Sequence, residues 1–315
     1  MEKRTLGKTD LDIYPIVFGG NVFGWTLDEK QSFKILDEFT AAGFNCIDTA
    51  DSYSRWAQGN SGGESEAIIG KWMKQKNNRN KIILATKVGS DNGQGRQLKK
   101  SYIIKSAEDS LKRLKTDYID LYQSHYDDAD TPITETLEAY DQLIKEGKIR
   151  WIGASNITAD RLKESLAVSA ENELPAYQTL QPHYNLYERE NFENGLEPLC
   201  LGHNLGVIPY YSLQSGFLTG KYRSKADFDK SPRGGGMEKF LDERGLRILD
   251  ALDEVAAESN STPAAVALAW LLHRPSVTAP IVSATTSEQL ESIIEAPKLD
   301  LDANIIRHLT SASAW

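Results

Sequence analysis

Asp48, Tyr53, Lys87 and His125 are the residues of this sequence whose types and spacing suit proton transfer. Asp48 and Lys87 end two consecutive β-branched runs, the next such run leads into His125, and Tyr53 lies just past Asp48. Each has an ordinary alternative: a loop cap, a half-buried ring, a lysine reaching solvent and a hydrogen-bonded core histidine. Because the carboxyl ends of parallel strands lie together, four such residues at successive strand ends favour one shared site.

Together these side chains could protonate an oxyanion of the kind that forms when a carbonyl group is reduced. A tyrosine hydroxyl has an ordinary pKa of about 10 and is a weak acid unless a nearby cation favours its ionised form. Lys87 could supply that charge, and Asp48 could orient and partly neutralise the lysine. His125 could position the carbonyl oxygen by donating a hydrogen bond. We therefore expect a proton-donor site centred on Tyr53.

The elements that must position these residues follow from hydrophobic periodicity. We expect strands at residues 16–18, 45–49, 82–86, 118–123, 149–153, 177–180, 207–210 and 278–282. We expect helices at residues 29–42, 62–76, 99–114, 133–146, 159–170, 190–203, 241–259, 263–273 and 287–296, with a helical tail after them. A hairpin of residues 3–6 and 11–14 comes first, and a long Gly-rich loop spans residues 213–237.

Eight strand–helix units in one linker-free chain predict an α/β fold. We expect a single (β/α)8 TIM barrel domain over residues 1–315, with an N-terminal β-hairpin and two extra helices. An open, doubly wound sheet would carry G-x-G-x-x-G at its first turn, whereas the first strand here ends in FGGN at residues 18–21. In a barrel, catalytic groups are expected at the carboxyl ends of the strands.

Composition argues against several other classes of protein. The net charge is −9 and basic residues are interspersed with acidic ones, whereas a nucleic-acid-binding protein needs a clustered basic face. The N-terminus lacks the apolar core of a signal peptide, and no run approaches the roughly 18 apolar residues of a membrane span. With only Cys46 and Cys200, a reducing, cytoplasmic location is expected. The five histidines show no ligand spacing, so no metal is expected.

Several motifs, in order along the chain, resemble those of the aldo-keto reductase family, in particular its long-loop branch of bacterial and potassium-channel β-subunit-like members. They are GFNCIDTA at 43–50, GESEAIIG at 63–70, TKV at 86–88, LYQSH at 121–125, IGASN at 152–156, QPHYN at 181–185 and YYSLQSGFLTGKY at 210–222. The resemblance implies reduction of a small carbonyl substrate, with Asp48, Tyr53, Lys87 and His125 as a catalytic tetrad and Tyr53 as proton donor. It leaves open whether the protein is a monomer or a homo-oligomer.

The same resemblance implies an extended NADP(H) across the barrel mouth. Ser155, Asn156 and Gln181 would hold the nicotinamide carboxamide, Tyr211 would stack on the nicotinamide, and the segment 216–221 would cover the pyrophosphate. Two alternatives are that Ser155 or Asn156 caps the next helix, and that Tyr211 belongs to the core. The residues expected to contact the cofactor are Gly20, Asn21, Asp48, Ser155, Asn156, Gln181, Tyr211, Ser212, Leu213, Gly216, Leu218, Lys221, Arg233, Ser283, Thr285 and Gln289.

Two departures from the family pattern bear on selectivity. The segment 283–286 lacks the usual basic residue, and Ser292 and Ile293 stand where relatives place a Glu-Asn pair on the adenine. NADP(H) is therefore expected with NAD(H) as an alternative, and Arg233 is the candidate for the 2′-phosphate, against a solvated loop arginine. An insert at 54–63 carries Trp56, which we expect to line the substrate pocket together with Tyr53 and His125; a mobile surface loop is the alternative.

Two other functions compete with carbonyl reduction. A nucleotide-binding sensor barrel could regulate a partner, although an intact tetrad disfavours it. A phosphate-binding lyase or isomerase would leave Gln181, Tyr211 and the Gly-rich loop unexplained. A Walker A phosphate loop is excluded, because the glycines at 216 and 220 have three residues between them and Tyr222 follows Lys221.

Overall fold

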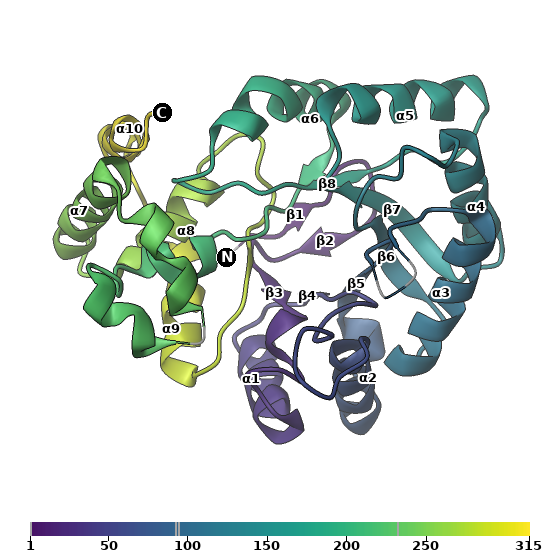
Figure 1. Cartoon of the computed structure of the whole chain (residues 1–315), viewed down its shortest axis with the longest axis horizontal. Coiled ribbons are helices and arrows are strands. Elements are labelled where there is room, and N and C mark those ends of the chain that lie inside the picture. Colours follow the sequence, from purple (N-terminus) through teal and green to yellow (C-terminus); the bar gives the residue numbers. More distant parts are fainter. Residues whose placement is uncertain (1, 92, 94, 232) are drawn as a thin grey trace.

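A computed structural model describes residues 2–91, 93, 95–231 and 233–315, and in it eight parallel strands form a barrel surrounded by helices (Figure 1). The strands are β3 (Val17–Gly19), β4 (Cys46–Asp48), β5 (Ile83–Val88), β6 (Ile119–Ser124), β7 (Ile149–Ser155), β8 (Thr179–Gln181), β9 (Gly206–Val207) and β10 (Ile281–Val282). Neighbours pair in the order β10-β3-β4-β5-β6-β7-β8-β9. A parallel bridge between Val207 and Val277 closes the ring, which confirms the predicted (β/α)8 barrel.

Helices cover the outside of this barrel. They are α1 (Glu29–Ala41), α2 (Glu64–Lys76), α3 (Lys100–Leu114), α4 (Ile133–Lys145), α5 (Ala159–Glu171), α6 (Glu197–His203), α7 (Glu243–Glu258), α8 (Pro263–Leu272), α9 (Ser287–Glu295) and α10 (Ala303–Ala312). Side-chain caps fix several of the starts, as in the capping box of Asp28 with Gln31. Helices α7 and α10 pack on each other outside the strand–helix repeat and are the two extra helices that the sequence predicts.

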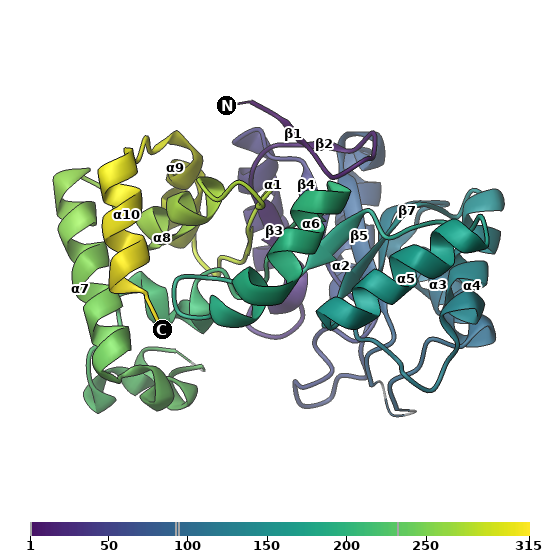
Figure 2. The same ribbon diagram turned by 90° about the horizontal axis from the view of Figure 1, so that it is seen from above.

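An N-terminal hairpin of β1 (Arg4–Thr5) and β2 (Asp12–Ile13) closes one end of the barrel. Its side chains Leu6, Leu11 and Ile13 are buried in one cluster with barrel residues such as Leu121 and Ile208. Figure 2 shows the hairpin at one end of the molecule and long loops at the opposite end. The carboxyl ends of the strands lead into those loops, so a site at that end remains open to ligands.

The structure differs from several of the predicted elements. The helix expected at 190–203 is divided, because Phe192–Leu196 forms a π-helical turn before α6 begins. The last strand is limited to Ile281–Val282, and the strand expected at 177–180 lies at Thr179–Gln181. The Gly-rich stretch contains short 3-10 turns, such as Gln214–Thr219; Pro232, within the same stretch, lies outside the described residues. Of the helices in the described residues, none is long and apolar enough to cross a membrane.

Candidate active site

Asp48, Lys87 and Tyr53 meet at the carboxyl ends of β4 and β5. Lys87 is completely buried, and its ammonium group donates hydrogen bonds to Asp48 Oδ2 at 2.5 Å, Thr49 O at 2.7 Å and the Tyr53 hydroxyl at 3.0 Å. The register of the barrel explains this meeting, since Asp48 pairs with Ala85, two residues before Lys87 on the neighbouring strand. Lys87 therefore joins two other residues of the expected tetrad, Asp48 and Tyr53, through direct hydrogen bonds.

The second oxygen of Asp48 is held by two amide groups. Asp48 Oδ1 accepts from Gln123 Nε2 at 3.1 Å and from Gln181 Nε2 at 3.0 Å. Gln181 Nε2 also lies 3.2 Å from Gln123 Oε1. Gln123 was not among the expected site residues, although its place in the run LYQSH, two residues before His125, was an available signal. These bonds fix the orientation of the carboxylate towards Lys87.

The charges in this cluster shift the pKa values of Lys87 and Tyr53. Burial by itself lowers the pKa of Lys87, but the Asp48 carboxylate and the Tyr53 oxygen outweigh it, so the net pKa is raised and the ammonium stays charged. Burial raises the pKa of Tyr53, and the Lys87 charge opposes this without cancelling it. The lysine therefore acts in the expected direction, but the net shift of Tyr53 is upward, and its hydroxyl is protonated at neutral pH.

His125 follows β6 and completes the group. Its ring lies 5.9 Å from the Tyr53 ring, and its backbone N–H donates to Val88 O at 2.7 Å. Burial, then the charges of Lys87 and Arg96, lower the pKa of the imidazole well below its ordinary value, so the ring is neutral at physiological pH. His125 Nδ1 is buried without a hydrogen-bond partner among the described residues. In the neutral ring, the nitrogen that carries the hydrogen can donate a hydrogen bond to an oxygen that reaches it.

An aromatic wall stands beside Tyr53. Trp56, from the insert, contacts the Tyr53 ring edge to face at 5.9 Å and the Trp25 ring at 5.7 Å. Trp56 remains 53% exposed, so its free face lines the opening rather than the core. Trp25 was not among the expected residues, and nothing in its local sequence singled it out. The two tryptophans place apolar surface next to the candidate proton donor.

Ser155 and Asn156 lie where β7 ends, next to His125. Ser155 Oγ donates to Gln181 O at 2.8 Å, and Asn156 Nδ2 donates to His125 O at 2.8 Å. Asn156 has a positive φ of 48°, which aims its side chain across the strand ends. Neither residue caps the following helix, because Thr158 is the N-cap of α5. The capping alternative is therefore wrong.

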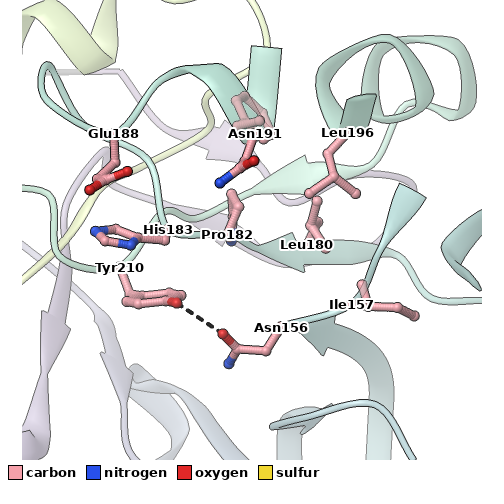
Figure 3. A pocket seen from close by; sticks show the side chains of 10 residues that line it. Asn156, Ile157, Leu180, Pro182, His183, Glu188, Asn191, Leu196 and Tyr210 are labelled. Atoms are coloured by element: carbon pink, nitrogen blue, oxygen red, sulfur yellow. Dashed lines mark hydrogen bonds between the residues drawn. The ribbon is translucent and has the colours of Figure 1, made fainter. Parts of the chain in front are cut away.

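A cavity of about 240 Å³ lies on the β7–β9 side of the mouth, and Figure 3 shows the side chains that line it. Tyr210 lines it and donates from its hydroxyl to Asn156 Oδ1 at 2.9 Å, with its ring stacked on His183 at 5.2 Å (Figure 3). Tyr210 was not among the expected site residues, whereas its neighbour Tyr211 was. Tyr211 has a positive φ of 51° and is 48% exposed, so it is not a core residue.

The expected residues after β3 and β10 form one chain of contacts with the long loop. Ser283 Oγ donates to Gly19 O at 2.6 Å. With the Asn21 amide nitrogen facing Ser283, the Asn21 oxygen accepts from Arg233 Nη2 at 3.0 Å. The Arg233 guanidinium also lies 5.1 Å from the centre of the Trp25 ring. Arg233 has no ion pair with a carboxylate among the described residues and is not a freely solvated loop arginine.

The remaining residues that we expected to contact the cofactor differ from one another in burial and in hydrogen bonding. Gly20 is buried, and a Cβ there would lie 2.8 Å from Ser65 Oγ. Ser212 donates to Pro209 O at 3.0 Å, and the Leu218 side chain is fully buried. Thr285 donates from its hydroxyl to Gln289 Oε1 at 3.0 Å at the start of α9. Leu213 is partly buried against the core, and the Lys221 ammonium lies beside Gly216, which has a φ of 99°.

Comparison with known proteins identifies relatives over nearly the whole chain. A sequence model of the Aldo/keto reductase family matches residues 15–314. The uncharacterized oxidoreductase YrpG of Bacillus subtilis is 36% identical over 98% of this chain and 95% of its own. The aldo-keto reductase YhdN of the same organism is 35% identical over 94% of this chain and 88% of its own. A probable voltage-gated potassium channel subunit beta of Arabidopsis thaliana is 31% identical over 94% and 91%.

Proposed function

The chain belongs to the aldo/keto reductase family of NAD(P)H-dependent oxidoreductases, and we propose that it transfers a hydride from NADPH to an aldehyde or ketone, with Tyr53 as proton donor. One observation carries the proposal: the buried Lys87 ammonium donates at once to the Asp48 carboxylate and to the Tyr53 hydroxyl, at 2.5 and 3.0 Å. A lysine held in this way stabilises the tyrosinate that proton donation leaves behind. The whole chain is proposed to act as one barrel domain.

The residues of the chain divide the proton chemistry between them. Neutral His125 donates a hydrogen bond to the carbonyl oxygen and polarises it. NADPH, when bound, would supply the hydride for the carbonyl carbon. Tyr53 gives its hydroxyl proton to the carbonyl oxygen, which yields an alcohol and a tyrosinate beside Lys87. Asp48 keeps Lys87 charged and in place, and a proton from solvent restores Tyr53 for the next turnover.

The residues at the mouth fit an anionic nucleotide. Arg233 lies at the opening against Asn21 and Trp25, and burial lowers the pKa of its guanidinium, since no described carboxylate balances its charge. Such a cation is stabilised when a phosphate binds it. Ser155, Asn156 and Gln181 would hold the carboxamide beside His125, where their amide and hydroxyl groups offer both donors and acceptors. We propose NADPH as the preferred cofactor, with NADH as the alternative.

The test is to follow NADPH absorbance with a panel of aromatic aldehydes, methylglyoxal, sugars and ketosteroids. Saturable oxidation of NADPH with alcohol formation from at least one carbonyl supports the proposal. Tight NADPH binding with no turnover on any of them would instead favour a nucleotide sensor. We consider the sensor function because one relative is described as a probable potassium channel subunit beta. Absence of nicotinamide nucleotide binding would contradict both functions.

A further inference from the structure

Arg96 is a cation beside the candidate reaction centre that has no ion pair among the described residues. It lies on the exposed loop after β5, and its guanidinium stacks over the Tyr126 ring at 3.9 Å from the ring centre. Tyr126 in turn stacks on His125 at 5.0 Å. The charge of Arg96 is close enough to His125 to contribute to its lowered pKa. None of the tetrad contacts described above uses this arginine.

The loop that carries Arg96 is joined to the insert that carries Trp56. Arg55 Nη1 donates to Asp91 O at 2.6 Å and lies 3.9 Å from Asp91 Oδ1. A Cβ placed on Gly93 would lie 3.1 Å from Arg55 Nη2, so the two loops are in close contact. The loops after β4, β5 and β6 therefore supply adjacent parts of one wall around Tyr53 and His125.

This wall has an aromatic part and a cationic part. Trp56 and Trp25 present aromatic surface next to Tyr53, and Tyr126 presents it next to His125. The cation at the outer end of the Tyr126 side is Arg96, whose planar group can bind a carboxylate through two hydrogen bonds. A molecule whose carbonyl reaches His125 and Tyr53 would place its ring between the aromatic side chains and its far end near this arginine.

We propose that the preferred substrates are aromatic aldehydes or ketones that carry a carboxylate at the end distant from the reacting carbonyl, with Arg96 binding that carboxylate. This inference rests on the proposed reductase function and names the substrate class of the same site. Stacking on Tyr126 holds the guanidinium edge free for the anion and limits the side-chain freedom lost when it binds. Neutral aromatic carbonyls lack this contact and should be poorer substrates.

The experiment compares 4-carboxybenzaldehyde with its neutral methyl ester in the wild type and in R96Q. We expect the ratio of kcat/KM for acid over ester to fall about 5- to 30-fold in R96Q, between the value of an exposed ion pair and that of a charge-assisted hydrogen bond. R96K should restore part of the ratio. R307Q is the matched control, because Arg307 is an exposed arginine on α10, and its ratio should equal that of the wild type. A ratio that stays the same in R96Q overturns the inference.

W56A separates the ring contact from the charge contact. It should lower kcat/KM for the acid and the ester by similar factors, because Trp56 contacts the ring region and carries no charge. A selective loss for the acid in W56A would place the anion contact at the insert and overturn the assignment to Arg96.

Binding of terephthalate, which has the ring and carboxylates but no reducible carbonyl, tests the inference without turnover. Calorimetry on the NADPH-loaded protein should show binding about 5- to 30-fold weaker in R96Q than in the wild type. If neither aldehyde is reduced while terephthalate binds and R96Q weakens it, the proposed reductase function fails and the anion site stands. No terephthalate binding to the wild type, or equal binding to both proteins, overturns the anion site.

Discussion

Two buried carboxyl groups lie three residues apart, Asp48 as the last residue of β4 and Asp51 in the loop after it, and their surroundings differ. Asp48 has a lysine on one oxygen and two amide groups on the other. Asp51 is 8% exposed, and both of its carboxyl oxygens lack a partner among the described residues. Burial, and then the neighbouring Glu66 carboxylate, raise the pKa of Asp51 to about 7 against the opposing charges of Arg113 and Lys87.

The difference shows which buried carboxyl group of this barrel stays ionised. A buried carboxylate is stable only when opposite charges and hydrogen bonds replace its hydration. Asp48 has these and can hold Lys87 charged for the reaction, whereas the nearby arginine, Arg113, is already bonded to Glu66 at 2.6 Å. Asp51 is left to take up a proton as the pH falls. Proximity to the reaction centre therefore does not make a carboxyl group part of it.

The largest expected effect tests the paired cluster. Tyr53→Phe removes the hydroxyl that Lys87 contacts, so kcat for carbonyl reduction should fall by about 10²- to 10⁴-fold, the usual contribution of general-acid catalysis. NADPH affinity, followed by protein fluorescence, should change little. Tyr118→Phe is the control, because Tyr118 precedes β6 at the opposite end of the barrel. A variant that keeps most of the wild-type kcat would show that Tyr53 is not the donor.

Lys87→Met removes the ammonium group that bonds to both Asp48 and Tyr53. Without the ammonium, the pKa of Tyr53 should rise further and reduction should fall by about 10²-fold or more. The single variant also leaves the Asp48 carboxylate buried without its cation, which is destabilising. The double variant Asp48→Asn, Lys87→Met removes that orphan charge and serves if the single variant does not fold. Near wild-type kcat in either folded, NADPH-binding variant would contradict the role given to the lysine.

Arg233 extends the comparison of paired and unpaired buried charges to a cation, because it is partly buried and has no ion pair among the described residues. If it binds the 2′-phosphate, Arg233→Ala should weaken NADPH binding about 10- to 150-fold, the value of a charge-assisted hydrogen bond, and hardly affect NADH. Titration of both cofactors by tryptophan fluorescence measures this. Equal losses for the two cofactors would mean that Arg233 binds the pyrophosphate, a position in keeping with its contacts to Asn21 and Trp25.

Asp51→Asn should have the smallest effect on catalysis, less than about twofold in kcat, because Asp51 is outside the paired cluster and contributes no general acid. Its effect is on stability. The folded-state pKa of about 7 lies above the ordinary value, so the wild type loses stability as pH rises from about 4 to about 7. Relative to the wild type, Asp51→Asn should gain about 2–3 kcal/mol in free energy of unfolding between pH 5 and pH 8.

Urea unfolding at the two pH values measures this gain, with Asp300→Asn, an exposed loop position, as the control. If the unfolding free energies of Asp51→Asn and the wild type have the same pH dependence, Asp51 is not protonated in the way its surroundings indicate. Loss of kcat comparable to that of Tyr53→Phe would move Asp51 into the reaction centre and remove the distinction between the two carboxyl groups.

Sequence reasoning predicted the barrel and the meeting of Asp48, Tyr53 and Lys87, because alternation of strands and helices determines which residues share one end of the barrel. It missed Gln123 as a support for Asp48, since a glutamine in a buried strand has no periodic signal and only its place two residues before His125 pointed to the site. It also could not foresee that burial outweighs Lys87 at the Tyr53 hydroxyl, because that balance depends on the depth of the site.

The cofactor-binding residues were harder to predict from the sequence than the tetrad, for a physical reason. Residues 211, 214, 215 and 216 all have positive φ, so side-chain directions in this segment do not follow strand or helix periodicity. Knowing that Tyr211 is half exposed while Leu218 is buried in the core requires those backbone angles. The π-helical turn at Phe192–Leu196 likewise adds a bulge that helical spacing does not reveal.

The contact between β9 and β10 closes the barrel, and it could link ligand binding to the local stability of the barrel. Each of these strands has two residues, and their contact depends on a few bonds, such as Thr278 N to Val207 O at 2.8 Å and Ile281 N to Pro209 O at 2.9 Å. Amide hydrogen exchange should report the earliest opening of the barrel at this seam, well before β5 and β6. Because Ser283 and Thr285 follow β10 directly, a nucleotide held there would slow exchange at the seam, and the degree of protection would measure how strongly cofactor binding is coupled to keeping the barrel closed.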